Sequence, residues 1–352
     1  SPRAPRPAFT EDMRKRYTIL APQMAPIHFK VIEAAFGASG YRLEILEKAG
    51  PGAVDEGLRS VHNDACFPSI LVVGQLLEAL GSGRYDLSPT AVLITQTGGG
   101  CRATNYIGFI RKALADQGLG QVPVISLSAT GLERNPGFRL GPGLLWRGLL
   151  SCVAGDLIMR LLYRTRPYEA SPGAADALAA QWIERARVLV ASPGLGAYRA
   201  FCRDLVAAFD ALPLDGQARK PRIGVVGEIL VKFHPDANGD VVGGIEAEGG
   251  EAVVPDLYGF LLYSAYNGIF RHRALGGSLK AALLARLAIG ALELVRSPAS
   301  RALERSGRFE APPASMPWLK ASTASSSWAT PPARAGSSPR RCSSSSRPGY
   351  RA

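Results

Sequence analysis

The chain has 352 residues, 47% of them hydrophobic, which is enough for the core of one large or two smaller domains. Its formal net charge is +12, but five Lys or Arg stand against two acids in residues 1–17 and nine against two in residues 299–352, so the body carries only +2. A nearly neutral body argues against nucleic acid as a ligand. The sequence has neither an apolar run of ~20 residues for a membrane span nor a signal peptide, so we expect a cytoplasmic location.

Short apolar runs and amphipathic helical segments alternate over the first 142 residues. Such alternation predicts a mostly parallel sheet with helices on both faces. Strands are expected at 16–20, 41–46, 91–95 and 122–128, with a weaker one at 58–64, and helices at 28–36, 69–80 and 105–117.

The second half of the chain reads differently. Residues 143–215 have helical patterns and few strand signals, and then a buried strand at 222–230, a short helix at 241–250, a strand at 251–257 and a helix at 280–295 are expected. We therefore predict an α/β protein with two Rossmann-like units of mostly parallel sheet. The expected parts are a flexible N-terminus (1–16), a first α/β unit (17–142), a helical connection (143–215), a second α/β unit (216–310) and a disordered tail (311–352).

The tail has an unusual composition. Residues 311–352 contain no Asp or Glu, and Met316 and Leu319 are the only residues there of the Leu, Ile, Val, Met and Phe types. Such a stretch cannot offset its ordering entropy by burial, which predicts disorder. The abrupt change is also typical of a shifted reading frame, the interpretation we favour. The chain begins with Ser1 rather than methionine, and we expect either a fragment of a longer gene product or a processed chain.

The five cysteines fall into different contexts. Five cysteines in a chain without a signal peptide argue against a disulfide framework, because the cytosol keeps thiols reduced. No CxxC occurs. Cys152 and Cys202 lie in apolar helical patterns and are expected to be small buried hydrophobes, whereas Cys342 lies in the tail. Cys66 and Cys101 each follow a strand candidate and precede a helix.

The segment TQTGGGCRATNY, residues 95–106, permits three interpretations. A phosphate cradle would suit a glycine-rich helix start, but neither GxxxxGK[ST] nor GxGxxG is present, and the glycines suit a tight turn equally well. A nucleophilic thiol would need one of the four histidines as its base, and the sequence places none of them beside Cys101. A metal-cluster ligand is the third option. Strand-to-helix turns of a doubly wound sheet share its carboxyl edge, where Cys66 and Cys101 could converge and helix N-termini favour the thiolate.

A family resemblance bears on these options. The segments VHNDACFPSILVVGQLLEAL, AVLITQTGGGCRATNYIGFIRKAL and QVPVISLS resemble the 2-hydroxyacyl-CoA dehydratase family (2-hydroxyglutaryl-CoA dehydratase D-component-like), in particular the dehydratase-like region of the large CoA-substrate-specific enzyme activases. RYTILAPQMAPIHFKVIEAAFGASGY and IGVVGEILVKFHPDANGDVVGGIEAEGGEAVVPDL are similar to its flanking segments. The resemblance covers about residues 16–300.

The resemblance implies an iron-sulfur protein. Family dehydratases hold a [4Fe-4S] cluster through three cysteines, and Cys66 and Cys101 match two of them. The third is expected where this chain has its tail, and Cys342 has none of the family context. The implied chemistry is anaerobic, ATP-activated, one-electron dehydration of a CoA thioester. The implied partner is the CoA-thioester substrate, or else a dehydratase or activator subunit. The chain could form a dimer. Any ATPase region is expected upstream of this sequence.

Further candidate residues surround the cysteines. Gln96, Thr97, Arg102, Asn105 and Tyr106 are candidates for contacts to the cluster or substrate. Their alternatives are a helix cap for Asn105, a core position for Tyr106 and a solvated charge for Arg102. Gly98 and Gly99 are included as cofactor-binding candidates.

The second unit adds a weaker set of candidates. Glu228, Lys232 and His234 follow its first strand, at an edge that could face the first site, although His234 suits a surface loop better than a ligand. Asn238 is expected to cap the next helix.

Two other functions stay open at this stage. One is a non-catalytic scaffold or partner-binding module with an incomplete cluster site. The other is a thiol hydrolase, which would require a histidine near Cys101 and no iron. Whether the chain acts as the dehydratase or as its activase component also stays open.

Overall fold

The computed structural model describes residues 7–47, 49, 51–62, 64–95, 105–127 and 135–313. The chain divides into two units, Ser1–Ala311 and Pro312–Ala352. All three parts predicted for the body, 17–142, 143–215 and 216–310, lie inside the first unit. The predicted tail falls almost wholly outside the described residues.

Four parallel strands form the main sheet, in the order β2-β1-β3-β4. They run as β1 (Thr18–Pro22), β2 (Arg42–Leu46), β3 (Thr90–Thr95) and β4 (Val124–Leu127). Ile19 of β1 lies opposite Leu43 of β2 on one side and opposite Ala91 of β3 on the other. The order reverses between β1 and β3, because the chain passes from β1 to one side and then crosses back, as in doubly wound sheets. An α/β fold with a parallel sheet is thereby confirmed.

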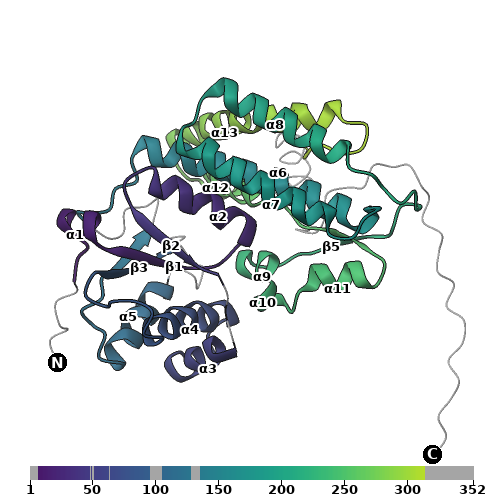
Figure 1. Cartoon of the computed structure of the whole chain (residues 1–352). Coiled ribbons are helices and arrows are strands. Elements are labelled where there is room, and N and C mark those ends of the chain that lie inside the picture. Colours follow the sequence, from purple (N-terminus) through teal and green to yellow (C-terminus); the bar gives the residue numbers. More distant parts are fainter. Residues whose placement is uncertain are drawn as a thin grey trace, which may run out of the picture. The chain divides into compact units, whose positions relative to one another are not determined.

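Helices cover both faces of this sheet (Figure 1). On one face α4 (Phe67–Gly81) and α5 (Tyr106–Asp116) pack on the strands, with α3 (Pro51–Ser60) outside them. The other face is covered by α1 (Glu11–Arg16), α2 (Pro26–Gly37) and the start of α6 (Pro142–Thr165). Helix α1 falls in the segment that was expected to be flexible.

Alternating residues of the strands pack into the two hydrophobic cores, one on each face of the sheet. Leu20, Val92 and Ile94 point into the α4–α5 cluster, while Ile19, Ala21 and Ala91 point to the α2 side. This two-residue period is the one that a parallel strand buried on both faces requires.

A helical layer follows, as predicted for 143–215. It consists of α6, the short 3-10 helix η2 (Arg166–Tyr168), α7 (Ala174–Ala191) and α8 (Leu195–Asp210). Helix α2 packs on α6 and α7, which joins this layer to the sheet.

The second sheet is small. Strands β5 (Arg222–Gly224) and β6 (Glu251–Val253) pair in parallel. Between them lie α9 (Ile229–Phe233), α10 (Pro235–Asn238) and α11 (Val241–Ala247). The buried strand expected at 222–230 is wrong in extent and in burial, because β5 is exposed along its length and the chain turns at Gly227, φ 151°, into α9.

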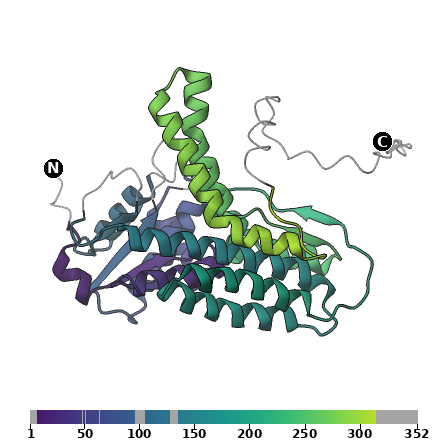
Figure 2. The same ribbon diagram turned by 90° about the horizontal axis from the view of Figure 1, so that it is seen from above.

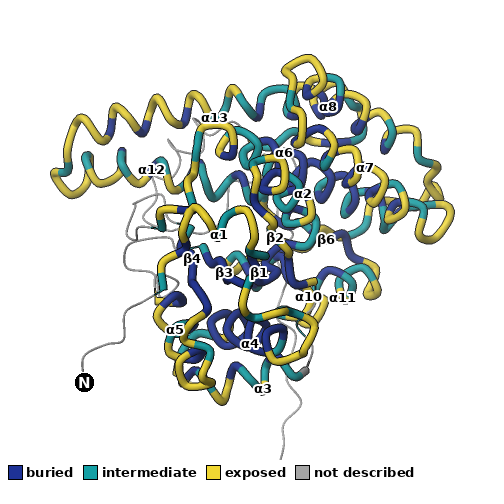
Figure 3. The backbone as a smooth tube through the Cα atoms, turned by 60° about the vertical axis from the view of Figure 1, so that its left-hand side comes forward, coloured by how far each residue is buried: buried dark blue, intermediate teal, exposed yellow. Residues whose placement is uncertain are grey.

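Two long helices complete the described chain. Helix α12 (Leu257–Leu275) was not expected from the sequence, whereas α13 (Leu279–Arg305) contains the helix predicted at 280–295. They form a hairpin whose far end extends beyond the other helices (Figure 2). Figure 3 shows that this end is largely exposed. Among the described residues, no helix is long and apolar enough to cross a lipid bilayer.

Candidate functional site

The carboxyl edge of the four-stranded sheet is where this fold positions ligands. Open parallel sheets bind at the point where the strand order reverses, outside the strand ends. Here that point lies beyond Pro22 of β1 and Thr95 of β3. The short helix α9 lies against this edge, since Leu230 packs in one cluster with Met24 and Leu46, the residues that follow or end β1 and β2.

Cys66 lies at this edge as the residue that precedes α4. Its backbone is extended, with φ −63° and ψ 143°, and its side chain is half-buried. The helix start that was predicted here is confirmed. The strand predicted at 58–64 is wrong, because helix α3 runs to Ser60, so Cys66 follows a helix–helix connection rather than a strand.

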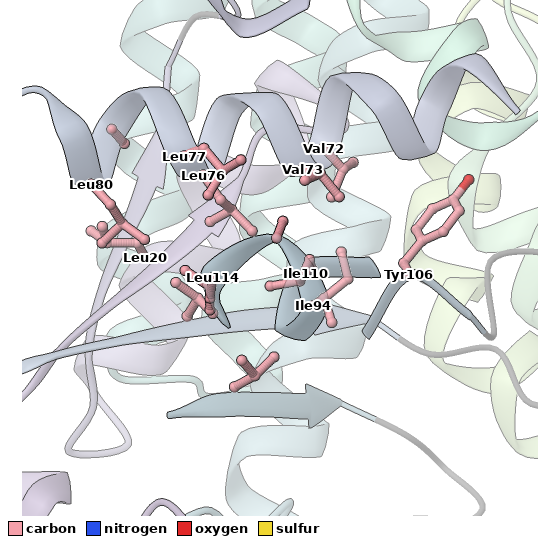
Figure 4. Close-up of a cluster of buried hydrophobic side chains, with 14 of the residues drawn as sticks. Leu20, Val72, Val73, Leu76, Leu77, Leu80, Ile94, Tyr106, Ile110 and Leu114 are labelled. Atoms are coloured by element: carbon pink, nitrogen blue, oxygen red, sulfur yellow. The ribbon is translucent and has the colours of Figure 1, made fainter. Parts of the chain in front are cut away.

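Tyr106 brings the starts of α4 and α5 together. The sulfur of Cys66 and the hydroxyl oxygen of Tyr106 are 3.3 Å apart, within hydrogen-bonding distance. The Tyr106 ring is buried at the end of the core cluster, and its hydroxyl points away from the leucines (Figure 4). The core position considered for Tyr106 is therefore confirmed, and its hydroxyl meets the candidate thiol.

The remaining candidates of the glycine-rich segment have different outcomes. Asn105 immediately precedes α5 and is exposed, but its side chain forms no capping hydrogen bond, so the alternative role of a helix cap is wrong. The others lie outside the described residues: Gln96, Thr97, Gly98, Gly99, Cys101 and Arg102.

A buried histidine–aspartate pair, not expected from the sequence, lies behind the edge. His28, in the first turn of α2, donates from Nε2 to Oδ1 of Asp156 on α6 at 2.8 Å. The same carboxylate accepts the backbone N–H groups of Leu257 (2.7 Å) and Tyr258 (2.8 Å) at the start of α12. One side chain thus joins three helices. The available signal was that Asp156 is the only acid within the apolar pattern of α6.

The close approach of α6 to α2 depends on Gly155. A Cβ atom added there would lie 2.7 Å from Cγ and 3.1 Å from Cα of His28, and nearer still to Cδ2. Real Cβ atoms do not approach neighbours this closely in packed interiors. Glycine at this position therefore permits the hydrogen bond between His28 and Asp156.

Residues of the α9–α10 segment face the same region. Glu228 caps α9, its carboxylate accepting from the backbone N–H groups of Leu230 (3.0 Å) and Val231 (3.4 Å). Burial lowers the pKa of Lys232, while the charges of Glu228 and Asp156 act in the opposite direction. Asn238 ends α10 and accepts from the backbone N–H of Val241 at 3.1 Å, but the cap of α11 is Asp240, whose carboxylate accepts from Gly243, so the cap expected at Asn238 is wrong.

His234 is buried rather than on a surface loop, which corrects the expectation for this residue. Its Nδ1 accepts from the backbone N–H of Asp236 at 3.2 Å, so the neutral ring carries its proton on Nε2. Nε2 is buried and has no hydrogen-bond partner among the described residues. In this tautomer Nε2 is a donor and not a metal ligand, so it suits an acceptor oxygen of a bound molecule.

The charge state of His234 gives a testable pH dependence. Burial lowers its pKa from 6.5, so the unfolded chain takes up a proton before the folded chain does as the pH falls below about 6.5. We expect His234→Asn, which can still cap α10, to reduce the loss of unfolding free energy between pH 7 and 5 by up to about 1.4 kcal/mol per pH unit. Urea unfolding at each pH measures this slope. An unchanged slope, equal to that of a control with exposed His62→Asn, would contradict the assignment.

The cysteines differ in their capacity to react or ligate. Burial raises the pKa of Cys152 to about 12 and that of Cys202 to about 12. Both lie on helices away from the edge. Cys202 is fully buried, which agrees with the prediction that it is structural, whereas Cys152 is half-buried. Within the described ranges, no group of three or more His, Cys, Asp or Glu side chains is arranged to hold a metal ion.

These environments predict selective alkylation. In the folded chain, iodoacetamide at neutral pH should modify Cys66 and spare Cys152 and Cys202, whose thiolate fractions are lowered about a thousandfold by a pKa of about 12. Mass spectrometry of tryptic peptides over a time course measures the rates, with urea-unfolded protein as the control in which all three react. Equal rates for Cys66 and Cys202 in the folded chain would contradict the prediction.

Comparison with protein-family models, curated proteins and solved structures finds no match to this chain.

Proposed function

We propose that this chain is an iron-sulfur protein of the 2-hydroxyacyl-CoA dehydratase and activase group, with Cys66 and Cys101 as ligands of one [4Fe-4S] cluster. The observation that carries the proposal is the position of Cys66. Its half-buried thiol lies at the carboxyl edge of the main sheet, 3.3 Å from the hydroxyl of Tyr106. Tyr106 follows Cys101 by five positions in the chain.

The chemistry of the described residues supports a cluster ligand at Cys66. Cysteine sulfur is the usual protein ligand of the iron atoms in such clusters, and the Cys66 side chain stands at the start of α4. The Tyr106 hydroxyl could donate a hydrogen bond to that sulfur, and such bonds tune cluster potentials. A bound cluster would supply low-potential one-electron chemistry.

The rest of the site would then hold the substrate. The proposed substrate is a CoA thioester that loses water, or the site serves a partner subunit that carries out this step. His234 offers a buried Nε2–H donor on the segment that covers the edge, suited to an acceptor oxygen such as a thioester carbonyl. Gln96, Thr97, Arg102 and Asn105 remain proposed contacts. We also propose that the protein is cytoplasmic. Residues 216–310 are proposed to be a second Rossmann-like unit with a reduced sheet.

Iron binding tests this proposal. After anaerobic reconstitution with iron and sulfide, the chain should bind iron at less than about four per chain, because two of the family's three thiolates are present in context. Cys66→Ser should abolish the iron, the sulfide and the visible absorption. Cys152→Ser, the same substitution on helix α6, should change none of them.

Two outcomes would overturn the proposal. If Cys66→Ser holds as much iron and sulfide as the unchanged chain, Cys66 is not a ligand. If the unchanged chain binds neither while remaining folded, the chain is better described as a scaffold that keeps the α/β fold without a cluster.

A further inference from the structure

A groove lies between α8 and α13, far along the chain from the cysteine site. The two helices run side by side in the same direction: the Tyr198 hydroxyl donates to the carbonyl of Val295 at 2.7 Å, and at their other ends the Ser306 hydroxyl bonds to Asp210 at 2.8 Å. A cavity of about 510 Å³ opens between them, and Trp146 of α6 also lines it. Its floor is apolar, with buried Tyr198 and Ala302.

Arginines line this groove from both helices. Arg199 and Arg203 lie one turn apart on α8, and Arg301 and Arg305 lie one turn apart on α13. All four are exposed, and no acidic residue lines the groove. Arg203 pairs with Asp204 at 2.8 Å, whereas the other three form no ion pair among the described residues. The groove therefore presents positive charge that the chain itself leaves largely uncompensated.

The same face of α13 continues as a row of exposed leucines. Leu283, Leu287 and Leu294 are separated by four and seven residues and lie on one helix face with Arg301 and Arg305. Their exposed fractions are 58%, 64% and 73%. An isolated exposed leucine needs no explanation, but a row of this length on a projecting hairpin does.

We propose that this face, from Leu283 to Arg305 together with the groove, binds an acidic amphipathic helix of a partner protein. Apolar residues of that helix would cover the leucines and the groove floor, and its Asp or Glu residues would pair with the arginines. Helix-in-groove recognition combines these two kinds of contact, and complementary charge selects the partner.

Occupants from the chain itself fit this face poorly. A second copy aligned in parallel would set arginines against arginines, and an antiparallel copy would set arginines on leucines. Residues 311–352 contain no Asp or Glu and cannot supply the complementary charge. A partner with acidic side chains satisfies both the leucines and the arginines.

A synthetic probe makes the proposal testable. The probe is a fluorescein-labelled peptide of about three heptads, with leucine at positions a and d and glutamate at e and g, which repel each other and keep the peptide monomeric. Fluorescence anisotropy with the full chain should give a dissociation constant of about 10 μM, and this constant should increase with added salt because the charge pairs are screened. Arg301→Glu with Arg305→Glu should weaken binding about tenfold or more, as should Leu287→Gln with Leu294→Gln.

Matched variants control for charge and hydrophobicity. Arg42→Glu with Arg219→Glu makes the same change of net charge at exposed arginines outside the groove, and Val188→Gln removes an exposed apolar side chain from α7. Both should bind the peptide as the unchanged chain does. All these positions are exposed, and circular dichroism should find every variant folded.

Several results would overturn the proposal. Equal binding of a peptide with lysine in place of glutamate would be one such result, and groove variants that bind the acidic peptide like their controls would be another. The acidic peptide could fail while pyrophosphate or phosphatidylserine vesicles bind in an arginine-dependent way, which would assign the groove to a small anion or a membrane. Concentration-dependent dimerisation that is lost in Leu287→Gln with Leu294→Gln and that blocks the peptide would assign the face to a second copy.

Discussion

Replacing Gly74 with alanine is expected to lower the free energy of unfolding by about 3 kcal/mol, at the upper end of the usual cost of overpacking. Helices α3 and α4 touch backbone to backbone here. A Cβ at Gly74 would lie 2.6 Å from the carbonyl carbon of Ala53 and 2.9 Å from the backbone nitrogen of Gly57, and nearer still to the Ala53 oxygen. Backbone atoms cannot swing aside as a side-chain end can, so the helices must separate.

The matched control is Gly81→Ala at the end of the same helix, where an added Cβ would meet no atom within 4 Å. Alanine there should be neutral or stabilising by up to about 1 kcal/mol. Urea unfolding of the three proteins measures both changes. If Gly74→Ala is as stable as Gly81→Ala, the close crossing that holds the start of α4, and with it Cys66, does not exist.

Loss of the Asp156 carboxylate should cost a similar amount. Asp156→Asn keeps the shape but replaces one acceptor oxygen by an amide that faces donors from His28, Leu257 or Tyr258. A buried donor left without its acceptor costs roughly 1–3 kcal/mol, and breaking a buried charged pair costs about 3–5. We therefore expect a loss of about 3 kcal/mol in unfolding free energy.

Exposed Asp204→Asn on α8 is the control for the same chemical change and should alter stability by less than about 0.5 kcal/mol. Chemical denaturation followed by circular dichroism measures both variants. Hydrogen exchange adds a local test, because the amides of Leu257 and Tyr258 should lose protection in Asp156→Asn. Preserved protection at both amides would contradict their assignment to this carboxylate.

The local sequence pattern predicts the four strands of the main sheet correctly, but it does not predict the helices α3 and α12. The strands at β1, β2, β3 and β4 are short and apolar, and their alternation with helices predicted a parallel sheet. The pattern at 58–64 is short and resembles a strand, but its first residues belong to the amphipathic run that begins at Pro51 and forms α3. Helix α12 lacks a clear apolar period, since aromatic and glycine residues occur around it, so no helix was expected there.

The site was predictable only where it depends on neighbours in sequence. Cys66 was placed at a helix start from its own context, and the structure agrees. The pair of His28 and Asp156 joins residues 128 positions apart, and no local pattern reports such a contact. The burial of His234 likewise depends on how α9 and α10 pack against the main sheet, which the sequence around it does not encode.

We propose that Cys66 and Cys101 converge at the carboxyl edge of the four-stranded sheet, and a crosslinking measurement tests this directly. A variant with Cys152, Cys202 and Cys342 replaced by alanine leaves these two thiols alone, and a short bifunctional thiol reagent, with crosslinked peptides identified by mass spectrometry, measures whether they meet. We expect an intrachain crosslink between Cys66 and Cys101, and none in a matched variant that keeps Cys66 and Cys152 as its only cysteines. Full single alkylation of both Cys66 and Cys101 without any crosslink between them would contradict it.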